Sequence, residues 1–228
     1  MKNKKFYPWL VVALLWVVAL LNYMDRQMLS TMQAAMKVDI VELQQAEAFG
    51  ALMAVFLWIY GIVSPFAGIV ADRISRKKLV VGSLFVWSLV TYLMGYASSF
   101  DQLYMLRALM GISEALYIPS ALSLIADWHE GKSRSLAIGV HMTGLYVGQA
   151  IGGFGATVAA AFSWHTTFHW FGILGIAYSV VLLLFLHDKD KDTTNMTMAL
   201  QEKPANGGLF QGLSVVLSTC CLLYTSDA

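Results

Sequence analysis

Six long apolar segments lie in residues 1–187 and constrain the fold more than any other feature of the sequence. A helix needs about 20 predominantly apolar residues to cross a bilayer. Segments of this length are placed at residues 8–30, 48–71, 79–99, 102–126, 134–161 and 166–187. Their apolar residues are continuous rather than alternating, which favours helices over the strands of a barrel. The sequence therefore predicts an all-α membrane protein in which residues 1–187 form a bundle of six transmembrane helices.

The composition agrees with a membrane protein and excludes some partners. Hydrophobic residues make up 58% of the chain and charged residues only 13%, whereas soluble domains carry about 25% charged residues. The formal net charge is +1 and no basic face stands out, which argues against nucleic acid as a partner. The first apolar segment continues to Ser30 without a cleavage site, so we expect it to be retained as a span. The predicted surroundings are the lipid bilayer.

Lysine and arginine residues are distributed unevenly between the two sides of this bundle. Twelve of the fifteen fall on one side: Lys2, Lys4, Lys5, Arg73, Arg76, Lys77, Lys78, Lys132, Arg134, Lys189, Lys191 and Lys203. The opposite side holds only Lys37. Because basic residues are enriched in cytoplasmic loops, both ends of the bundle are predicted to be cytoplasmic. The expected location is the plasma membrane, which is the inner membrane in a bacterium.

The residues after the bundle are predicted to form two further segments. Residues 188–208 are rich in polar residues, which is typical of a linker on the cytoplasmic side. Residues 209–228 begin another apolar stretch that is too short to cross a bilayer, so we interpret it as the truncated start of a seventh span. The last eight residues, 221–228, resemble a translated sequencing adapter, and we expect them to be an artefact.

Four charged residues lie inside the apolar segments: Asp25, Arg26, Arg107 and Glu114. A charged side chain at the centre of a bilayer costs about 2.5–3.5 kcal/mol on insertion scales. These residues are therefore predicted to face the protein interior or a water-filled path. Helical periodicity places Arg107 and Glu114 on one face, places Asn22 and Arg26 on another, and offsets Asp25 from Arg26 by about 100°. Both arginines are expected toward the outer half and Glu114 nearer the midplane.

The connection between the second and third segments carries a recognisable motif. It reads Gly68-Ile-Val-Ala-Asp72-Arg73-Ile-Ser75-Arg76-Lys77-Lys78. This resembles the signature loop of the major facilitator superfamily, G-x-x-x-D-R-x-G-R-K/R. We expect Gly68 to let two helices approach closely and Asp72 to lie against a helix N-terminus. The basic residues, Arg73, Arg76 and Lys77 among them, are expected to stay in water. Ser75 replaces the family's glycine, which weakens the expected tight turn.

The resemblance implies an architecture as well as a loop. Proteins of this family have twelve helices in two bundles, and each bundle consists of two inverted three-helix repeats. The chain would then supply the N-terminal six-helix bundle, with a C-terminal six-helix bundle as its missing partner. Substrates bind near the midplane between the two bundles. Without its partner this fragment is expected to be inactive.

A narrower resemblance involves the first and fourth segments. The pattern N-x-M-D-R in the first, and R-x-x-x-G-x-x-E-A followed by a proline in the fourth, resemble the anion:cation symporter branch. This implies symport of an organic anion such as a sugar acid, coupled to H⁺ or Na⁺, with no other cofactor. The matching residues are Asp25 and Glu114 as proton-linked acids, and Arg26 and Arg107 as substrate-binding bases. The neighbouring side chains expected to contact substrate are Asn22, Tyr23 and Tyr117.

Alternative interpretations remain open at this stage. Spinster-like lipid transporters share N-Y-x-D-R and G-x-x-E-A, and the charged residues can also be structural ion pairs, Asp25 with Arg26 or Arg107 with Glu114. A channel would need a pore without alternating access. An enzyme is not predicted, because no nucleophile–base or metal constellation is evident. His165 and His169 have the spacing of a metal-binding pair but no acidic or cysteine partner beside them, so no metal site is predicted.

Overall fold

A computed structural model describes residues 6–189, and at Asp72 it describes the backbone only. The described residues are almost entirely helical. The elements are α1 (Tyr7–Thr31), α2 (Gln33–Asp39), η1 (Val41–Gln44), α3 (Ala46–Arg73), α4 (Arg76–Met94), α5 (Phe100–Ala115), α6 (Tyr117–Trp128), α7 (Lys132–Gly152), α8 (Gly155–Phe162) and α9 (Trp164–Phe185). The predicted linker from residue 190 onward, the seventh segment and the adapter-like tail all lie outside the described residues.

The six predicted spans are present in the described region. Helices α1, α3, α4 and α9, and the continuous pair α5–α6, are each long and apolar enough to cross a membrane. The sixth span is the pair α7–α8, which is bent by 42°. One boundary was wrong, because the third span ends at Met94 rather than at residue 99. The short helices α2 and η1 were also not predicted. A turn at Gly95 ends α4, and the Ser99 side chain then caps α5.

The fourth span is interrupted at Leu116, between α5 and α6. Pro119 lies in the first turn of α6. Proline has no backbone N–H, so it cannot bond the carbonyl of Ala115 four residues earlier, and its ring crowds that carbonyl. The interruption falls two residues after Glu114, which leaves this acid in the last turn of α5.

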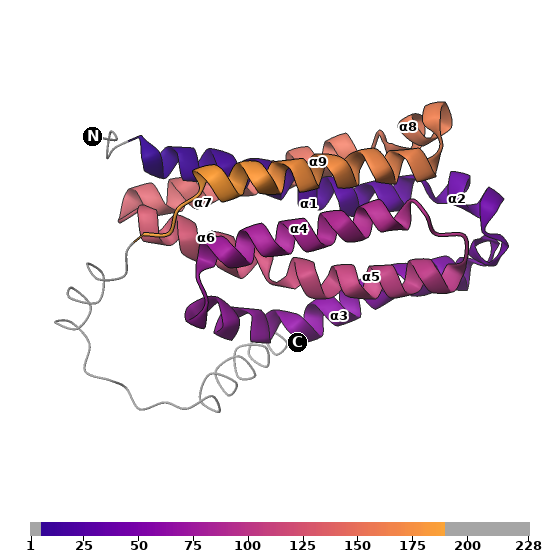
Figure 1. Ribbon diagram of the computed structural model, residues 1–228, viewed down its shortest axis with the longest axis horizontal. Helices are drawn as coiled ribbons and strands as arrows, with labels where there is room; N and C mark the ends of the chain where they lie inside the picture. Colours follow the sequence, from indigo (N-terminus) through magenta and orange to yellow (C-terminus); the bar gives the residue numbers. More distant parts are fainter. Residues whose placement is uncertain (1–5, 190–228) are drawn as a thin grey trace, which may run out of the picture. The chain divides into compact units, whose positions relative to one another are not determined.

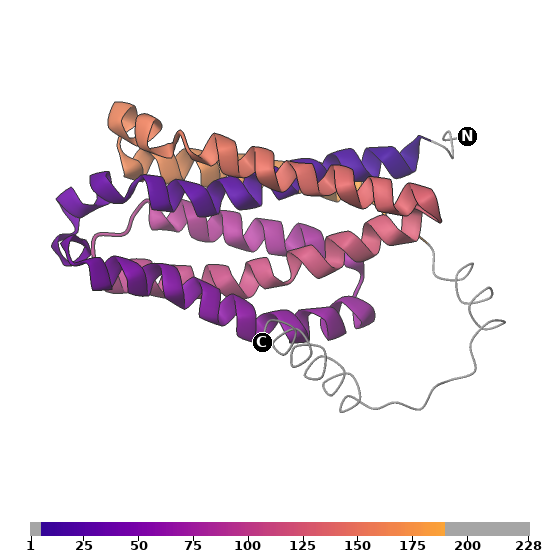
Figure 2. The same cartoon turned by 180° about the vertical axis from the view of Figure 1, so that it is seen from behind.

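The spans pack in pairs that reflect the two predicted repeats. Helix α1 packs along α7, α3 packs along α5, and α4 packs along α9 (Figure 1, Figure 2). If the first, second and third spans exchange places with the fourth, fifth and sixth, the pair of the first and fifth spans becomes the pair of the fourth and second. The third and sixth spans pair with each other. This pattern is the one expected for two three-helix repeats related by a two-fold axis.

Glycines allow the backbones of two of these pairs to touch. A Cβ at Gly148 of α7 would lie 2.2 Å from the Leu20 carbonyl oxygen of α1, and a Cβ at Gly144 would lie 2.6 Å from that of Trp16. In the other pair, a Cβ at Gly111 of α5 would lie 2.9 Å from the Phe56 carbonyl oxygen of α3. Small residues at such contacts allow membrane helices to approach closely. Gly144 and Gly148 of the fifth span therefore serve packing.

The signature loop differs from expectation at Gly68 and Arg76. A Cβ at Gly68 would have no neighbour within 4 Å among the described residues, so the predicted close helix approach is not made within this region. The end of α3 lies at the edge of the bundle (Figure 1). Arg76 does not stay in water: its guanidinium is ion-paired with Asp127 of α6 and donates to the Ser123 carbonyl at 3.2 Å. Arg73 is exposed and Lys77 is half-buried.

An acidic side chain does lie at the N-terminus of α4, but it comes from beyond α9. The Lys77 backbone N–H donates to Asp188 Oδ1 at 2.8 Å, and the Ser75 hydroxyl donates to the same carboxylate. The side chain of Asp72, to which this position was assigned, is not described. Ser75 itself accepts from the Lys78 N–H at 3.2 Å. The serine thus caps α4 where the family has glycine.

The two histidines of α9 bind the backbone of the neighbouring helix. The Nδ1 atom of His165 lies 2.8 Å from the Gly95 carbonyl oxygen, and that of His169 lies 3.0 Å from the Tyr92 carbonyl oxygen. The last carbonyls of a helix have no partner within the helix itself. The histidines therefore cap the C-terminal end of α4.

Candidate functional site

An ion pair joins the first and fourth spans inside the bundle. Arg26 Nε of α1 donates to Glu114 Oε2 of α5 at 2.7 Å, and the Glu114 side chain is fully buried. The sequence suggested pairs of Asp25 with Arg26 or of Arg107 with Glu114. The observed pair differs from both, because it joins Arg26 to Glu114. Glu114 Oε1 and Arg26 Nη2 have no hydrogen-bond partner among residues 6–189. Each group thus keeps binding capacity for something else.

Three aromatic rings surround the Arg26 guanidinium. Its central carbon lies 5.0 Å from the ring centroid of Tyr23 and 4.8 Å from those of Phe56 and Tyr60. A cation over an aromatic face is attracted by the ring, more strongly where water is excluded. Phe56 and Tyr60 of α3 were missed by the sequence analysis. The i, i+4 spacing of two aromatic residues was the available signal.

Arg107 of α5 is buried without a carboxylate partner. Its exposed fraction is 1%, and no salt bridge within 4.0 Å involves it among the described residues. Its Nη1 atom contacts the sulfur of Met110 at 3.1 Å, a weak acceptor. Its central carbon lies 4.5 Å from the Phe56 ring centroid, so this one ring contacts both guanidinium groups. A buried charge is costly unless it is paired, and the Arg107 guanidinium has no such pair among the described residues.

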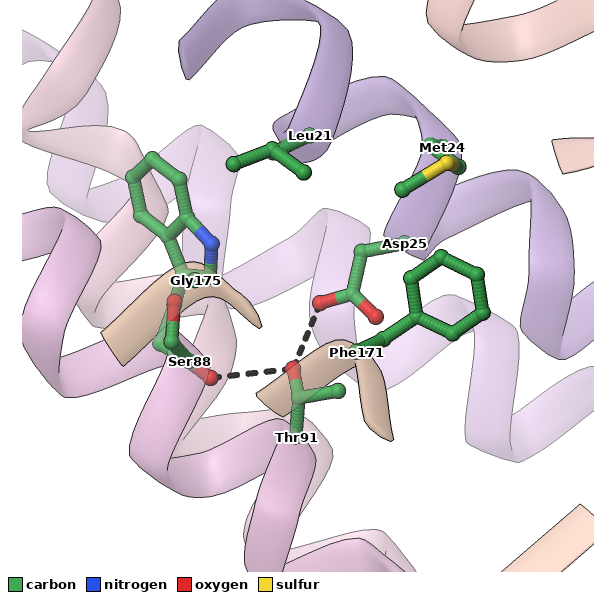
Figure 3. A pocket seen from close by; sticks show the side chains of 8 residues that line it. Leu21, Met24, Asp25, Ser88, Thr91, Phe171 and Gly175 are labelled. Carbon is green, nitrogen blue, oxygen red and sulfur yellow. Dashed lines mark hydrogen bonds between the residues drawn. The ribbon is translucent and has the colours of Figure 1, made fainter. Parts of the chain in front are cut away.

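Asp25 points toward α4. Its Oδ2 atom accepts a hydrogen bond from the Thr91 hydroxyl at 2.6 Å, and it lines a small cavity between α1, α4 and α9 (Figure 3). Asp25 is 6% exposed, and the Oδ1 atom of its carboxyl group has no hydrogen-bond partner in the described region. The predicted offset from Arg26 thus places the two adjacent charges in different environments.

Two other side chains that the sequence predicts for the site, Asn22 and Tyr117, are also buried. Asn22 is fully buried, and neither atom of its amide has a partner among residues 6–189. The Tyr117 hydroxyl donates to the Leu15 carbonyl at 2.9 Å, so it already has a partner on α1. His141 of α7 is also buried, with both ring nitrogens unpartnered in the described region. Buried polar groups without partners are rare in native structures, so Asn22 and His141 are candidate site residues.

The fold and the site together define a class of protein. A bundle of apolar helices in two inverted repeats encloses a guanidinium without a carboxylate, an arginine–glutamate pair and a separate carboxyl group. These are features of a polytopic membrane protein with charged residues buried in its interior. The Major Facilitator Superfamily model matches residues 15–224. The chain belongs to this superfamily.

Curated relatives carry names of sugar-acid transporters. The chain is 27% identical to the hexuronate transporter of Bacillus subtilis (strain 168), over 96% of this chain and 51% of the relative. It is 28% identical to the probable galactarate/D-glucarate transporter GudP of Escherichia coli (strain K12), over 88% of this chain and 46% of the relative. The chain thus spans about half the length of these relatives.

Solved structures agree on the fold. A bacterial homologue of the human lysosomal transporter Spinster, crystallised in an inward-facing and unoccupied conformation, superimposes with a TM-score of 0.71 at 22% identity. The superposition covers 92% of this chain and 47% of that structure. At this level of identity the likeness shows the fold alone.

Proposed function

We propose that the complete protein is a secondary active transporter that carries an organic anion, such as a sugar acid, by alternating access. The observation that carries this proposal is Arg107, a buried guanidinium with no carboxylate within 4.0 Å among residues 6–189. A guanidinium binds a carboxylate through two parallel hydrogen bonds. The names of the curated relatives support a sugar acid as the anion and a transporter rather than an enzyme.

Coupling to a cation follows from the acids beside the arginines. Glu114 holds Arg26 at 2.7 Å. If Glu114 takes up a proton, it loses its charge and releases Arg26, whose guanidinium then becomes a second ligand for the substrate. Asp25 would bind a proton in its own cavity. The aromatic cage of Tyr23, Phe56 and Tyr60 keeps Arg26 in place while its partner changes. In this scheme substrate and proton cross the membrane together.

Neutralising the two acids tests the coupling. In the complete transporter, Asp25→Asn and Glu114→Gln are each expected to abolish accumulation of a sugar acid above its external concentration, because each removes a proton-binding carboxyl group. The measurement is uptake of radiolabelled glucuronate and galactarate into proteoliposomes with an imposed pH gradient. Glu130→Gln, an exposed acid, serves as the control. Unchanged accumulation in both Asp25→Asn and Glu114→Gln would reject the coupling role.

The chain by itself is expected not to transport. The relatives are about twice as long, and the site of this fold lies between two bundles. One bundle cannot alternate its exposure against an absent partner. Proteoliposomes that contain residues 1–228 alone should therefore show the same glucuronate uptake as empty ones. Saturable uptake by this chain would contradict the expectation.

Transport of a lipid is the second candidate function. It is compatible with the fold that the chain shares with the Spinster homologue. The two candidates differ in what competes for the site. A sugar-acid site should be blocked by glucuronate and be insensitive to lysophospholipid at the same concentration. The opposite result would favour the lipid.

A further inference from the structure

The Thr91 hydroxyl lies between two acceptors. Its Oγ1 atom is 2.6 Å from Asp25 Oδ2 and 3.0 Å from the Trp87 carbonyl oxygen (Figure 3). A hydroxyl has one proton to donate and can also accept. Thr91 can therefore bond Asp25 in two ways. It donates to the carboxylate when Asp25 is charged; when Asp25 is protonated, it accepts from the carboxyl O–H and donates to the Trp87 carbonyl.

The cavity beside this pair is small and mostly apolar. Its volume is about 10 Å³, which is room for one water molecule at most. Besides the Asp25 carboxyl group, it is lined by the hydroxyl-bearing residues Ser88 and Thr91 and by side chains such as Trp87 and Phe171. Hard metal cations are bound by about six oxygen ligands. The side chains that line the cavity offer four oxygen atoms, two from Asp25 and one each from Ser88 and Thr91, which is fewer than a metal cation such as sodium takes, whereas a proton needs only the carboxyl group.

The charged groups that act on Asp25 belong to α1 and α5. Glu114 and Arg107 of α5 and Arg26 of its own helix are close enough to act on Asp25 electrostatically. The cavity residues of α4 and α9, among them Thr91 and Phe171, carry no charge. Asp25 thus interacts with the arginine–glutamate cluster through space, while its hydrogen bond is made to Thr91 of α4, a helix that takes no part in that cluster.

We propose that Asp25 and Thr91 form a proton-binding site that is separate from the anion site and excludes sodium, with Thr91 as its positioning residue. This rests on the proposed transport function and specifies its coupling ion. The proton enters as H⁺ from water and forms an O–H bond on Asp25, and the Thr91 proton turns from Asp25 to the Trp87 carbonyl. Both states keep a hydrogen bond between the two side chains, and no heavy atom has to move.

Thr91→Val and Thr91→Ser in the complete transporter test the positioning role. Valine removes the hydroxyl with little change of shape. Hydrogen bonds to a charged group are stronger than those to a neutral one, so the charged state of Asp25 loses more. The pH midpoint of glucuronate uptake is therefore expected to rise by about one unit in Thr91→Val and to return in Thr91→Ser. Replacing sodium with choline should change neither.

Thr167→Val is the matched control. Thr167 of α9 is buried, and its hydroxyl donates to a backbone carbonyl at 2.7 Å as that of Thr91 does, but the bond is to Ser163 and no acid is involved. This variant should keep the original pH midpoint. A shift as large in Thr167→Val as in Thr91→Val would show that loss of any buried hydroxyl is sufficient, and would overturn the proposal.

Infrared difference spectroscopy separates this proposal from the transport function. A carboxyl C=O band that appears on acidification should be absent in Asp25→Asn and should change frequency in Thr91→Val, whether or not a sugar acid is transported. If the band behaves in this way without any uptake, the proton site stands and the transport proposal fails. If uptake is proton-driven but neither band nor midpoint responds to Thr91→Val, the site is refuted alone. A band that shifts on adding sodium would refute the exclusion of sodium.

Discussion

Replacing Arg107 by lysine in the complete transporter is expected to lower sugar-acid uptake by about 100-fold. The guanidinium of Arg107 is 1% exposed and contacts the Phe56 ring and the Met110 sulfur. Lysine keeps the charge but loses the planar fork that bonds both oxygens of a carboxylate, and it stacks less well on an aromatic ring. The loss should appear mainly as a raised KM, because the missing interaction is made to the bound substrate.

Two comparisons make this result specific. Arg134→Lys changes an exposed arginine on α7 and should leave uptake unchanged. Arg26→Lys should also impair uptake, but it breaks the Glu114 contact as well, so its pH dependence should change while that of Arg107→Lys should not. Uptake within about twofold of the original in Arg107→Lys, at equal protein in the membrane, would remove Arg107 from the substrate site.

The spans and the buried charges could be predicted because one physical cost dominates them. Apolar side chains are more stable in lipid than in water, so long apolar segments cross the bilayer. The cost of placing a charge in lipid makes Asp25 and Arg107 face the protein interior. The sequence also placed Asp25 and Arg26 in different directions, because adjacent residues on a helix differ by about 100°. These conclusions need only local geometry and the properties of the bilayer.

The pairing of the charges could not be predicted in this way. That Arg26 bonds Glu114 depends on how α1 and α5 are rotated and aligned, which one helix does not determine. Phe56 was missed for a related reason: it is 2% exposed, whereas its neighbours Leu57 and Trp58 are 61% and 72% exposed, although all three are hydrophobic residues. In a membrane span, hydrophobicity does not separate the face toward lipid from the face toward protein.

Dependence on neighbouring helices also explains why the signature loop differs from expectation. Motif resemblance assigned a packing role to Gly68 and a solvated role to Arg76. Whether a glycine meets a neighbour depends on the helix beside it, and Gly68 has none within 4 Å in the described region. Arg76 has Asp127 within reach because α6 ends next to the start of α4. The residues of the loop alone determine neither the surroundings of Gly68 nor the ion pair of Arg76.

Substituting Gly148 by alanine is expected to destabilise the bundle by about 1–3 kcal/mol, as overpacking of a tight contact does. The added Cβ would lie 2.2 Å from the Leu20 carbonyl oxygen and 2.9 Å from its carbonyl carbon and Cα, which are backbone atoms and cannot rotate away. Helix α1 must therefore shift from α7. Because α1 also carries Asp25 and Arg26, the shift should disturb the site as well as the fold.

Gly139→Ala supplies the control for this prediction on the same helix. A Cβ at Gly139 would meet nothing within 4 Å in the described region, so alanine there should be neutral or slightly stabilising through its better helix propensity. The measurement is the thermal unfolding midpoint of the purified complete transporter in detergent, together with its yield from the membrane. Gly148→Ala should lower both, and Gly139→Ala should lower neither. Equal midpoints for the two variants would mean that α1 and α7 are not held together by backbone contact at this position.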